Sequence, residues 1–472
     1  MELEIAEIFS KHIINSKFED LDDNAVKKMK IFLLDTLGVG IAGSTGAKLS
    51  ELKNVASSWS KGNQCSVLGT WEKYSRDAST LINAYQIHCL EFDCIHEGAV
   101  VHPMAAILSS TLAHCETKSK LGHIVNGKEF LLSLALGVDI ASYLGISAKG
   151  ELKFFRPATA SGFGAIAALS KIEKFSMEEV HNALGIMYSQ TCGNMQSHVE
   201  GVPILGLQVG FNAKAALVSM DLTIAGFPGP KRVFNGEHGY FKLIENNDYD
   251  TTYLKENIGK VWMVNELAHK PYPSGRLTHG LVHALKDLKS KYGLNKDDIV
   301  SIECLVPPGV HKLVSRPIVD NLTTNYSKLC AKFVGASFMI NNHLDIESFT
   351  EKKYLNNNET LDFAKKITLI KNEKLDQKVL TPQKFIINVV NEVAVKTPDI
   401  VNISYPERLK GADFKGYDVD FSVSYQSVNT NFVNIFIGDK SKPYGKFSPT
   451  QSVDFNVQRI IKLLVLILLH II

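Results

Sequence analysis

Residues 26–43 read VKKMKIFLLDTLGVGIAG, and this stretch gives the clearest indication of the fold class. Apolar side chains recur at spacings of three and four residues, which places them on one face of a helix. Gly38, Gly40 and Gly43 lack side chains, so they let a neighbouring backbone approach closely or end the helix. The stretch therefore predicts a helix packed against other helices.

Six further segments with helical patterns follow before about Val264. Small residues dominate one of them, TASGFGAIAAL, which indicates burial between other helices. The Gly/Pro cluster GFPGP at 226–230 ends the series. The segments are Ser75–Leu90, Pro103–Cys115, Glu129–Leu144, Thr159–Leu169, Met177–Tyr188 and Gly210–Gly226.

The pattern changes after Val264 and becomes mixed. Two segments look helical, Leu277–Tyr292 and Asn321–Asn341, and three have strand character, Ile299–Val306, Phe385–Val395 and Val419–Val423. We therefore predict a mainly α protein with a large all-helical domain at 1–266 and a smaller α+β domain at 267–447. A C-terminal helix at 448–472 is expected to return to the helical domain.

Composition excludes several classes of protein. Lys and Arg number 51 against 49 Asp and Glu, so the net charge is +2, and no dense basic run suggests a nucleic-acid binder. Seven dispersed cysteines without a CxxC pair favour reduced thiols and a cytoplasmic location. The N-terminal stretch has the features of neither a signal nor a transit peptide, although a mitochondrial location stays open. The apolar stretch 460–472 is shorter than the ~20 residues of a membrane span, so we expect no membrane association.

The segment 89–103, CLEFDCIHEGAVVHP, is the richest in groups that can carry chemistry. Asp93, His96 and His102 stand shortly before an expected helix start at Pro103, and free N–H groups at a helix start favour anions. Carboxylates and imidazoles at such a place could bind a substrate carboxylate and transfer protons. The alternatives are helix caps with surface ion pairs, or a metal site made by Asp93, His96 and His102, whose spacing matches no common metal motif.

Basic residues in two other segments could complete such a site. Lys270, in the loop KPYPSGR, could hold a carboxylate, and Arg276 follows it. Arg156 stands between aromatic residues and the small-residue helix. Each could equally be an ordinary surface or helix-end residue. His279 and His283 lie four residues apart, hence on one helix face, where packing explains them better than metal binding.

Several motifs, in this order and spacing, resemble the MmgE/PrpD family, which includes 2-methylcitrate dehydratase and cis-aconitate decarboxylase. The resemblance runs over roughly residues 5–370. Its markers are LLDTLGVGIAGS at 33–44, INAYQIHCLEFD at 82–93, HP at 102–103, GVDIASYLG at 137–145, GLQVGFNAKAAL at 206–217, GFPGP at 226–230 and KPYPSGRLTHG at 270–280.

This resemblance implies a helical domain covered by a smaller α+β lid domain, a homodimer, and no metal or organic cofactor. The family's chemistry is proton abstraction next to a carboxylate, followed by loss of water or CO₂ or by reprotonation. Asp93, His102 and Lys270 match family site residues, as substrate-orienting carboxylate, proton carrier and carboxylate clamp. Arg156, Gln208, His96 and Arg276 are expected to contact the substrate.

The sequence also departs from the family's pattern. By eye, Arg156 stands where characterised members carry a histidine, Leu205 where they carry a lysine, and Gly275 where decarboxylases carry another histidine. An arginine keeps its proton at neutral pH and so cannot replace a proton donor. We therefore expect a lyase acting on a small di- or tricarboxylate, with an epimerase of such an acid, or a catalytically inactive binding protein, as alternatives.

Overall fold

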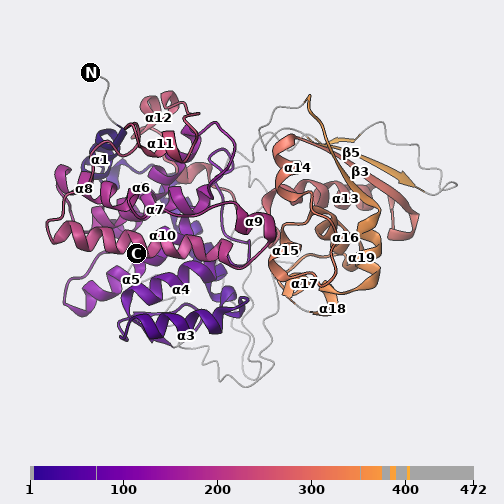
Figure 1. The fold of residues 1–472 in the computed structure, drawn as a ribbon, viewed down its shortest axis with the longest axis horizontal. Helices are drawn as coiled ribbons and strands as arrows, with labels where there is room; N and C mark the ends of the chain where they lie inside the picture. The colour runs from indigo at the N-terminus through magenta and orange to yellow at the C-terminus, as the bar shows by residue number, and fades with distance from the viewer. Residues whose placement is uncertain (1–4, 71, 351, 375–382, 390–400, 404–472) are drawn as a thin grey trace.

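The computed structural model describes residues 5–70, 72–350, 352–374, 383–389 and 401–403 (Figure 1). The predicted mainly α class, with a smaller α+β portion, is confirmed. The strand predicted at Val419–Val423 and the helix predicted at 448–472 lie outside the described residues.

The first part of the chain forms a helical domain, drawn in indigo to magenta in Figure 1. Its helices are α1 Ile5–Asn15, α2 Asp23–Ala42, α3 Leu49–Trp59, α4 Arg76–His88, α5 Met104–Lys120, α6 Gly127–Ser147, α7 Arg156–Ile172, α8 Met177–Tyr188, α9 Gln196–Glu200, α10 Ile204–Ile224, α11 Tyr240–Leu243 and α12 Thr252–Asn257. A short antiparallel pair, β1 Cys65–Ser66 and β2 Lys73–Tyr74, lies before α4. The 3₁₀ turns are η1 Phe18–Asp20, η2 Gly43–Thr45 and η3 Met263–Glu266.

Local sequence explains where α6 starts and why it is buried. Asn126 accepts a hydrogen bond from the backbone N–H of Glu129 at 3.0 Å, and the Glu129 side chain accepts one from the N–H of Asn126 at 3.3 Å. The helix is apolar and long enough to span a membrane, but 94% of its most apolar stretch is buried inside the protein. Helix α6 is therefore a core helix here.

Helices α6 and α7 pack closely because glycines face each other. A Cβ atom added at Gly137 would lie 2.8 Å from the carbonyl oxygen of Gly164, and one added at Gly164 would lie 2.5 Å from the carbonyl oxygen of Gly137. Ile107 of α5 fills the space beside both glycines. This contact lies within the largest core of the molecule, which consists of residues from the helical domain apart from Leu329.

The second part of the chain has its own core around a four-stranded sheet, drawn in orange shades in Figure 1. The strand order is β4-β3-β5-β6, with β3 parallel to β4 and antiparallel to β5, and β5 antiparallel to β6. The strands are β3 Ile299–Val306, β4 Ile367–Lys371, β5 Gln383–Val389 and β6 Val401–Ile403. The helices are α13 His279–Tyr292, α14 Pro308–Val314, α15 Thr324–Lys328, α16 Ala331–Asn341, α17 Glu347–Thr350, α18 Lys352–Leu355 and α19 Asn358–Lys365, with 3₁₀ turns η4 Arg276–Thr278 and η5 Lys296–Asp298.

The prediction of one helix over Asn321–Asn341 was wrong. The chain forms α15 and α16 instead, with Cys330 between them in an extended conformation. The carbonyl oxygen of Lys328 accepts a hydrogen bond from the N–H of Gly275 at 2.9 Å, so it does not continue the helical ladder. The break places Lys328 at the boundary with the helical domain.

Candidate active site

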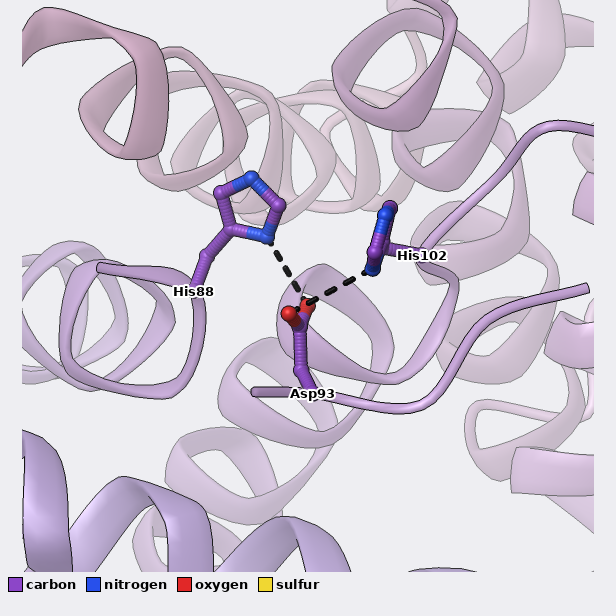
Figure 2. Close-up of side chains that lie close together, drawn as sticks. All are labelled: His88, Asp93 and His102. Atoms are coloured by element: carbon purple, nitrogen blue, oxygen red, sulfur yellow. Dashed lines mark hydrogen bonds and ion pairs between the residues drawn. The ribbon is translucent and has the colours of Figure 1, made fainter. Parts of the chain in front are cut away.

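The turn that follows α4 brings two polar side chains together. His88 is the last residue of α4, and Glu91 has a φ of +52°, a left-handed conformation that non-glycine residues rarely adopt. The chain reverses there, and the Asp93 carboxylate faces back toward His88 (Figure 2). The Nδ1 atom of His88 lies 2.8 Å from Oδ2 of Asp93. Strained backbone of this kind is often found at functional sites.

A second histidine faces the same carboxylate from the start of α5. His102 precedes Pro103, the N-cap residue of that helix, and its Nδ1 atom lies 3.3 Å from Oδ1 of Asp93. The two imidazole rings are nearly perpendicular, with centroids 5.1 Å apart. His88, Asp93 and His102 are all buried. One carboxylate therefore joins two buried imidazoles, as Figure 2 shows.

Burial and the shared carboxylate act in opposite directions on the two histidines, and a different effect wins at each. Burial opposes the charged form of His88, but Asp93 outweighs burial and raises the pKa of His88. Burial lowers the pKa of His102, and Asp93 only partly offsets the effect. Burial disfavours the Asp93 carboxylate, yet the two imidazoles hold its pKa well below the usual range. At neutral pH the cluster contains an ionised Asp93 and a neutral His102.

The tautomer of His102 is constrained by its neighbour. Its Nδ1 atom lies 3.3 Å from Oδ1 of Asp93 without forming a hydrogen bond in the described structure. Because an ionised carboxylate only accepts hydrogen bonds, a proton on Nδ1 is the arrangement that suits this pair. The Nε2 atom of the neutral ring is then unprotonated and can accept a proton.

The same three residues also have the donor set of a metal site. One ligand atom from each of His88, Asp93 and His102 lies within 4.8 Å of the others, so His88 takes the place that the sequence-based alternative gave to His96. The Lys270 ammonium opposes the charged form of both imidazoles, although the pKa of His88 is raised overall. The same trio can therefore serve proton transfer or hold a metal ion.

Lys270 lies beside this cluster, held by Glu91. Its Nζ atom donates to Oε2 of Glu91 at 3.0 Å and to the backbone oxygen of Glu91 at 3.2 Å. The Lys270 ammonium outweighs burial and lowers the pKa of Glu91 to about 2. Oε1 of Glu91 is 3.8 Å from Nε2 of His88. Glu91 thus connects the cation to the histidine cluster.

Two further cations approach from the second domain. Lys328 donates to the carbonyl oxygen of Cys89 at 3.1 Å, in the turn that carries Glu91. Arg316 donates to the carbonyl oxygen of His198 in α9 and lies 3.3 Å from Nδ1 of that histidine. Burial, reinforced by Arg316, lowers the pKa of His198 to about 4, so this imidazole is neutral.

Arg156 and Gln208 have partners outside this cluster. The Arg156 guanidinium donates to both carboxylate oxygens of Glu245, at 3.0 and 2.8 Å, and this ion pair is buried. Gln208 accepts from the N–H of Asn194 at 2.7 Å and donates to its carbonyl at 3.2 Å. Both side chains hold the fold in the present structure, and their predicted contact with substrate stays a prediction.

His96 and Arg276 also lie in ion pairs near the domain boundary. Nδ1 of His96 accepts from the N–H of Ala99 at 3.2 Å, and its Nε2 atom is 3.7 Å from Glu266. Arg276 donates to the carboxylate of Glu97, which joins the second domain to the segment that carries His96. Their predicted role in substrate binding is likewise untested.

The departures from the family pattern have a structural explanation at two positions. Leu205 is buried in the helical core at the start of α10. Gly275 lies against Leu329, whose Cδ2 atom would be 2.9 Å from a Cβ atom at that position. Neither position supplies a polar group to the site.

Sequence reasoning missed His88, Lys328 and Arg316 as site residues. His88 could have been found, because it stands five residues before Asp93 at the end of a predicted helix. Lys328 and Arg316 are ordinary basic residues in sequence, and only the folding of the second domain brings them to the turn after α4.

A cavity of about 320 Å³ elsewhere in the helical domain is a weaker candidate site. Ile13, Leu132 and Phe175 contribute to its lining, and its Lys171 ammonium donates to three backbone carbonyl oxygens at the end of α1. None of the lining residues belongs to the histidine cluster.

Comparison with known proteins identifies the family of the chain. The family model described as the MmgE/PrpD N-terminal domain matches residues 7–252, and the MmgE/PrpD C-terminal domain matches residues 272–406. Together the two models match well over half of the chain, which therefore belongs to the MmgE/PrpD family.

Curated relatives share between a fifth and a quarter of their residues with this chain. The cis-aconitate decarboxylase-like protein oryM of Aspergillus oryzae is 25% identical over 382 residues, which are 76% of this chain and 78% of the relative. The cis-aconitate decarboxylase of Aspergillus terreus is 23% identical over 385 residues, 77% of each chain. The human cis-aconitate decarboxylase is 25% identical over 362 residues, 74% of this chain and 73% of the relative. These names support a lyase role at the level of the family.

Proposed function

We propose that this protein is a lyase that abstracts a proton next to a carboxylate of a small di- or tricarboxylic acid, without a metal or organic cofactor. The observation that carries the proposal is the buried Asp93 carboxylate shared by His88 and His102, with Lys270 beside it. A base, an acid and a fixed cation are the groups that this chemistry requires.

In the proposed reaction His102 is the general base. Its unprotonated Nε2 atom takes the proton from the carbon next to the substrate carboxylate, and the ring becomes an imidazolium. Asp93 stabilises this new charge through Nδ1, as the carboxylate of a catalytic triad does for its histidine. Since His102 is neutral at neutral pH, it is ready to accept the proton.

Lys270 and His88 would stabilise negative charge and protonate the leaving group. Lys270 stabilises the enediolate-like charge that develops on the substrate carboxylate. In a dehydration, His88 donates its proton to the departing hydroxyl, which leaves as water while the carbon–carbon double bond forms. In a decarboxylation no proton is removed first: CO₂ leaves, the electron pair of the broken carbon–carbon bond stays on the substrate, and His88 donates the proton that the substrate carbon takes up.

The proposal also includes a homodimer, carried over from the family resemblance, and a cytoplasmic location, carried over from the dispersed cysteines and the N-terminal stretch. Size-exclusion chromatography with light scattering would test the dimer, and a monomer at micromolar concentration would remove that part without affecting the chemistry.

An epimerase is the second candidate, because two imidazoles share one carboxylate. His88 and His102 could remove a proton from one face of a carbon and return one to the other face. Incorporation of deuterium from solvent into substrate, with no loss of water or CO₂, would favour this reaction over a lyase.

The test is turnover of citrate, 2-methylcitrate and cis-aconitate by the wild type and by His102→Gln. We expect the variant to lose about 10²- to 10⁴-fold in kcat, the usual contribution of a general base. His114→Gln is the matched control, since His114 in α5 is, like His102, a buried histidine paired with a carboxylate, here Glu173 at 2.6 Å. Wild-type turnover of none of these acids, or full activity in His102→Gln, would count against the proposal.

A further inference from the structure

Three buried cations surround the turn after α4, but only one of them has a carboxylate partner. Lys270, Lys328 and Arg316 are 4%, 1% and 7% exposed. Of these three cations, Lys270 alone forms an ion pair with Glu91 among the described residues. Burial of a cation without a counter-charge is costly, so the arrangement calls for an anion.

Lys328 has unused hydrogen-bonding capacity. A lysine ammonium has three N–H donors, and in the described part of the chain this one makes a single hydrogen bond, to the Cys89 carbonyl at 3.1 Å. Burial lowers the pKa of Lys328 to about 8, and Glu91 opposes that shift. The ammonium therefore lies close enough to Glu91 to be affected by its charge, and it is mainly charged at pH 7.

Arg316 also has a hydrogen-bond donor without a partner in the described structure. Its Nη2 atom is held by His198, whereas its Nη1 atom is buried and has no hydrogen-bond partner in the described structure. The guanidinium carbon lies 5.1 Å from the centre of the Tyr326 ring, which orients the group without neutralising it. Tyr326 and Lys328 both belong to α15, so one short helix positions both cations.

The other buried arginines are neutralised. Arg156 forms a two-bond ion pair with Glu245, and Arg276 is paired with Glu97. Each of these two buried arginines therefore has a carboxylate partner within the protein. In the described part of the chain Arg316 lacks one, and the carboxylate whose charge acts on its pKa is Glu91, already bound to Lys270.

We propose that Lys328 and Arg316 form a second anion-binding subsite, contributed by the C-terminal domain, which holds a substrate carboxylate remote from the reacting carbon. This inference rests on the proposed function and assigns two residues to the second carboxylate of its di- or tricarboxylic substrate. The subsite supplies positive charge that the helical domain lacks, because Leu205 is apolar and Arg156 is bound to Glu245.

Contacts across the domain boundary fix the geometry of this subsite. Gly201 ends α9 with a φ of +66°, and a Cβ atom there would lie 2.6 Å from the Tyr326 backbone and 2.9 Å from Nη1 of Arg316. Only glycine fits this approach. Figure 1 shows α9 at the boundary next to α15. The cations are therefore held against the helical domain before substrate arrives.

Calorimetric titration with citrate, succinate and butyrate tests this subsite at pH 7. The wild type should bind citrate and succinate more tightly than butyrate. In Lys328→Met and Arg316→Met the affinity for citrate should fall about tenfold or more, the effect of losing one charged hydrogen bond, while that for butyrate changes less than about threefold. Lys328→Arg should keep most of the affinity.

Lys332→Met is the matched control, because it removes one positive charge from α16, next along the chain from α15, and should leave citrate binding unchanged. Circular dichroism of each variant checks that the fold is intact. Unchanged citrate affinity in both methionine variants, or equal loss for citrate and butyrate, would overturn the subsite.

His102→Gln separates this inference from the proposed function. That variant should bind citrate as the wild type does and fail to turn it over. Normal turnover with no effect of Lys328→Met would remove the subsite alone. Absence of both turnover and carboxylate binding in the wild type would remove both proposals.

Discussion

The Asp93 carboxylate controls two imidazoles at once, and this sets the expected pH dependence at the scale of single residues. His102 must be neutral to accept a proton, and its pKa lies below the ordinary histidine value. Lys328 must be charged to hold an anion, and its pKa is lowered to about 8. The active form therefore exists between these two limits, as long as His88, whose pKa is raised, keeps the proton that it donates in a dehydration.

We predict a bell-shaped dependence of kcat/KM on pH for the substrate identified. At low pH, activity should fall as His102 becomes protonated, at a pH below the ordinary histidine pKa of 6.5. At high pH, activity should fall above about pH 8, as Lys328 loses its charge. Stopped assays in constant-ionic-strength buffers from pH 5 to 9.5 measure this. The alkaline limb should move to higher pH in Lys328→Arg; a limb that stays near 8 in that variant would assign it to another group.

The sequence predicted some of these residues and could not predict others. Asp93, His102 and Lys270 stand in motifs whose polar residues are unusual for their surroundings, and the structure brings them to one region. The ion pair of Arg156 with Glu245 spans 89 positions and has no local sequence signal. Lys328 and Arg316 are functional candidates only because long-range folding buries them.

At the scale of helices and strands, the spacing of apolar residues was sufficient to predict the bounds of elements that depend on local contacts. Helix α8 and strand β3 have the predicted bounds, because each has a regular pattern flanked by turn or capping residues. Ser176 caps α8 by accepting from the N–H of Glu179 at 3.3 Å. The break between α15 and α16 was not predictable, since it depends on the hydrogen bond from the distant Gly275.

The glycine contact of α6 and α7 leads to a prediction about stability. Gly164→Ala should lower the free energy of unfolding by about 1–3 kcal/mol, because its methyl group would clash with the Gly137 carbonyl. Gly38→Ala in α2 is the control: nothing lies within 4 Å of the added carbon. It should raise stability by about 0.5–1 kcal/mol through helix propensity.

Thermal or urea unfolding of both variants beside the wild type measures this difference. If Gly164→Ala were as stable as Gly38→Ala, the close approach of the two backbones would be contradicted.

At the scale of the whole molecule, two separate cores meet at a polar boundary. Four contacts cross it around the candidate site: Lys270 to Glu91, Arg276 to Glu97, Lys328 to the Cys89 carbonyl and Arg316 to the His198 carbonyl. Apolar contacts cross the boundary too, since Leu329 belongs to the helical core. Buried cations nevertheless lie on it here, so an anion bound there should hold the two halves together.

We therefore predict that citrate stabilises the whole protein. At about 100 times its dissociation constant, a ligand that binds only the folded state adds about 2.7 kcal/mol, which corresponds to a rise of a few degrees in Tm. Differential scanning calorimetry with citrate, and with sodium chloride at matched ionic strength, measures the shift. An equal shift with both salts would indicate general screening and argue against a bound carboxylate.

The break between α15 and α16 has a consequence for how such an enzyme changes over generations. In the proposed reaction the proton-transfer groups reside in the helical half, whereas the residues that distinguish one acid from another reside largely in the other half. Substitutions near Lys328 could then select a longer, shorter or less acidic molecule while His102 and Asp93 stay undisturbed. In a family built this way, substrate specificity can change through substitutions in the C-terminal domain while the proton-transfer residues stay the same.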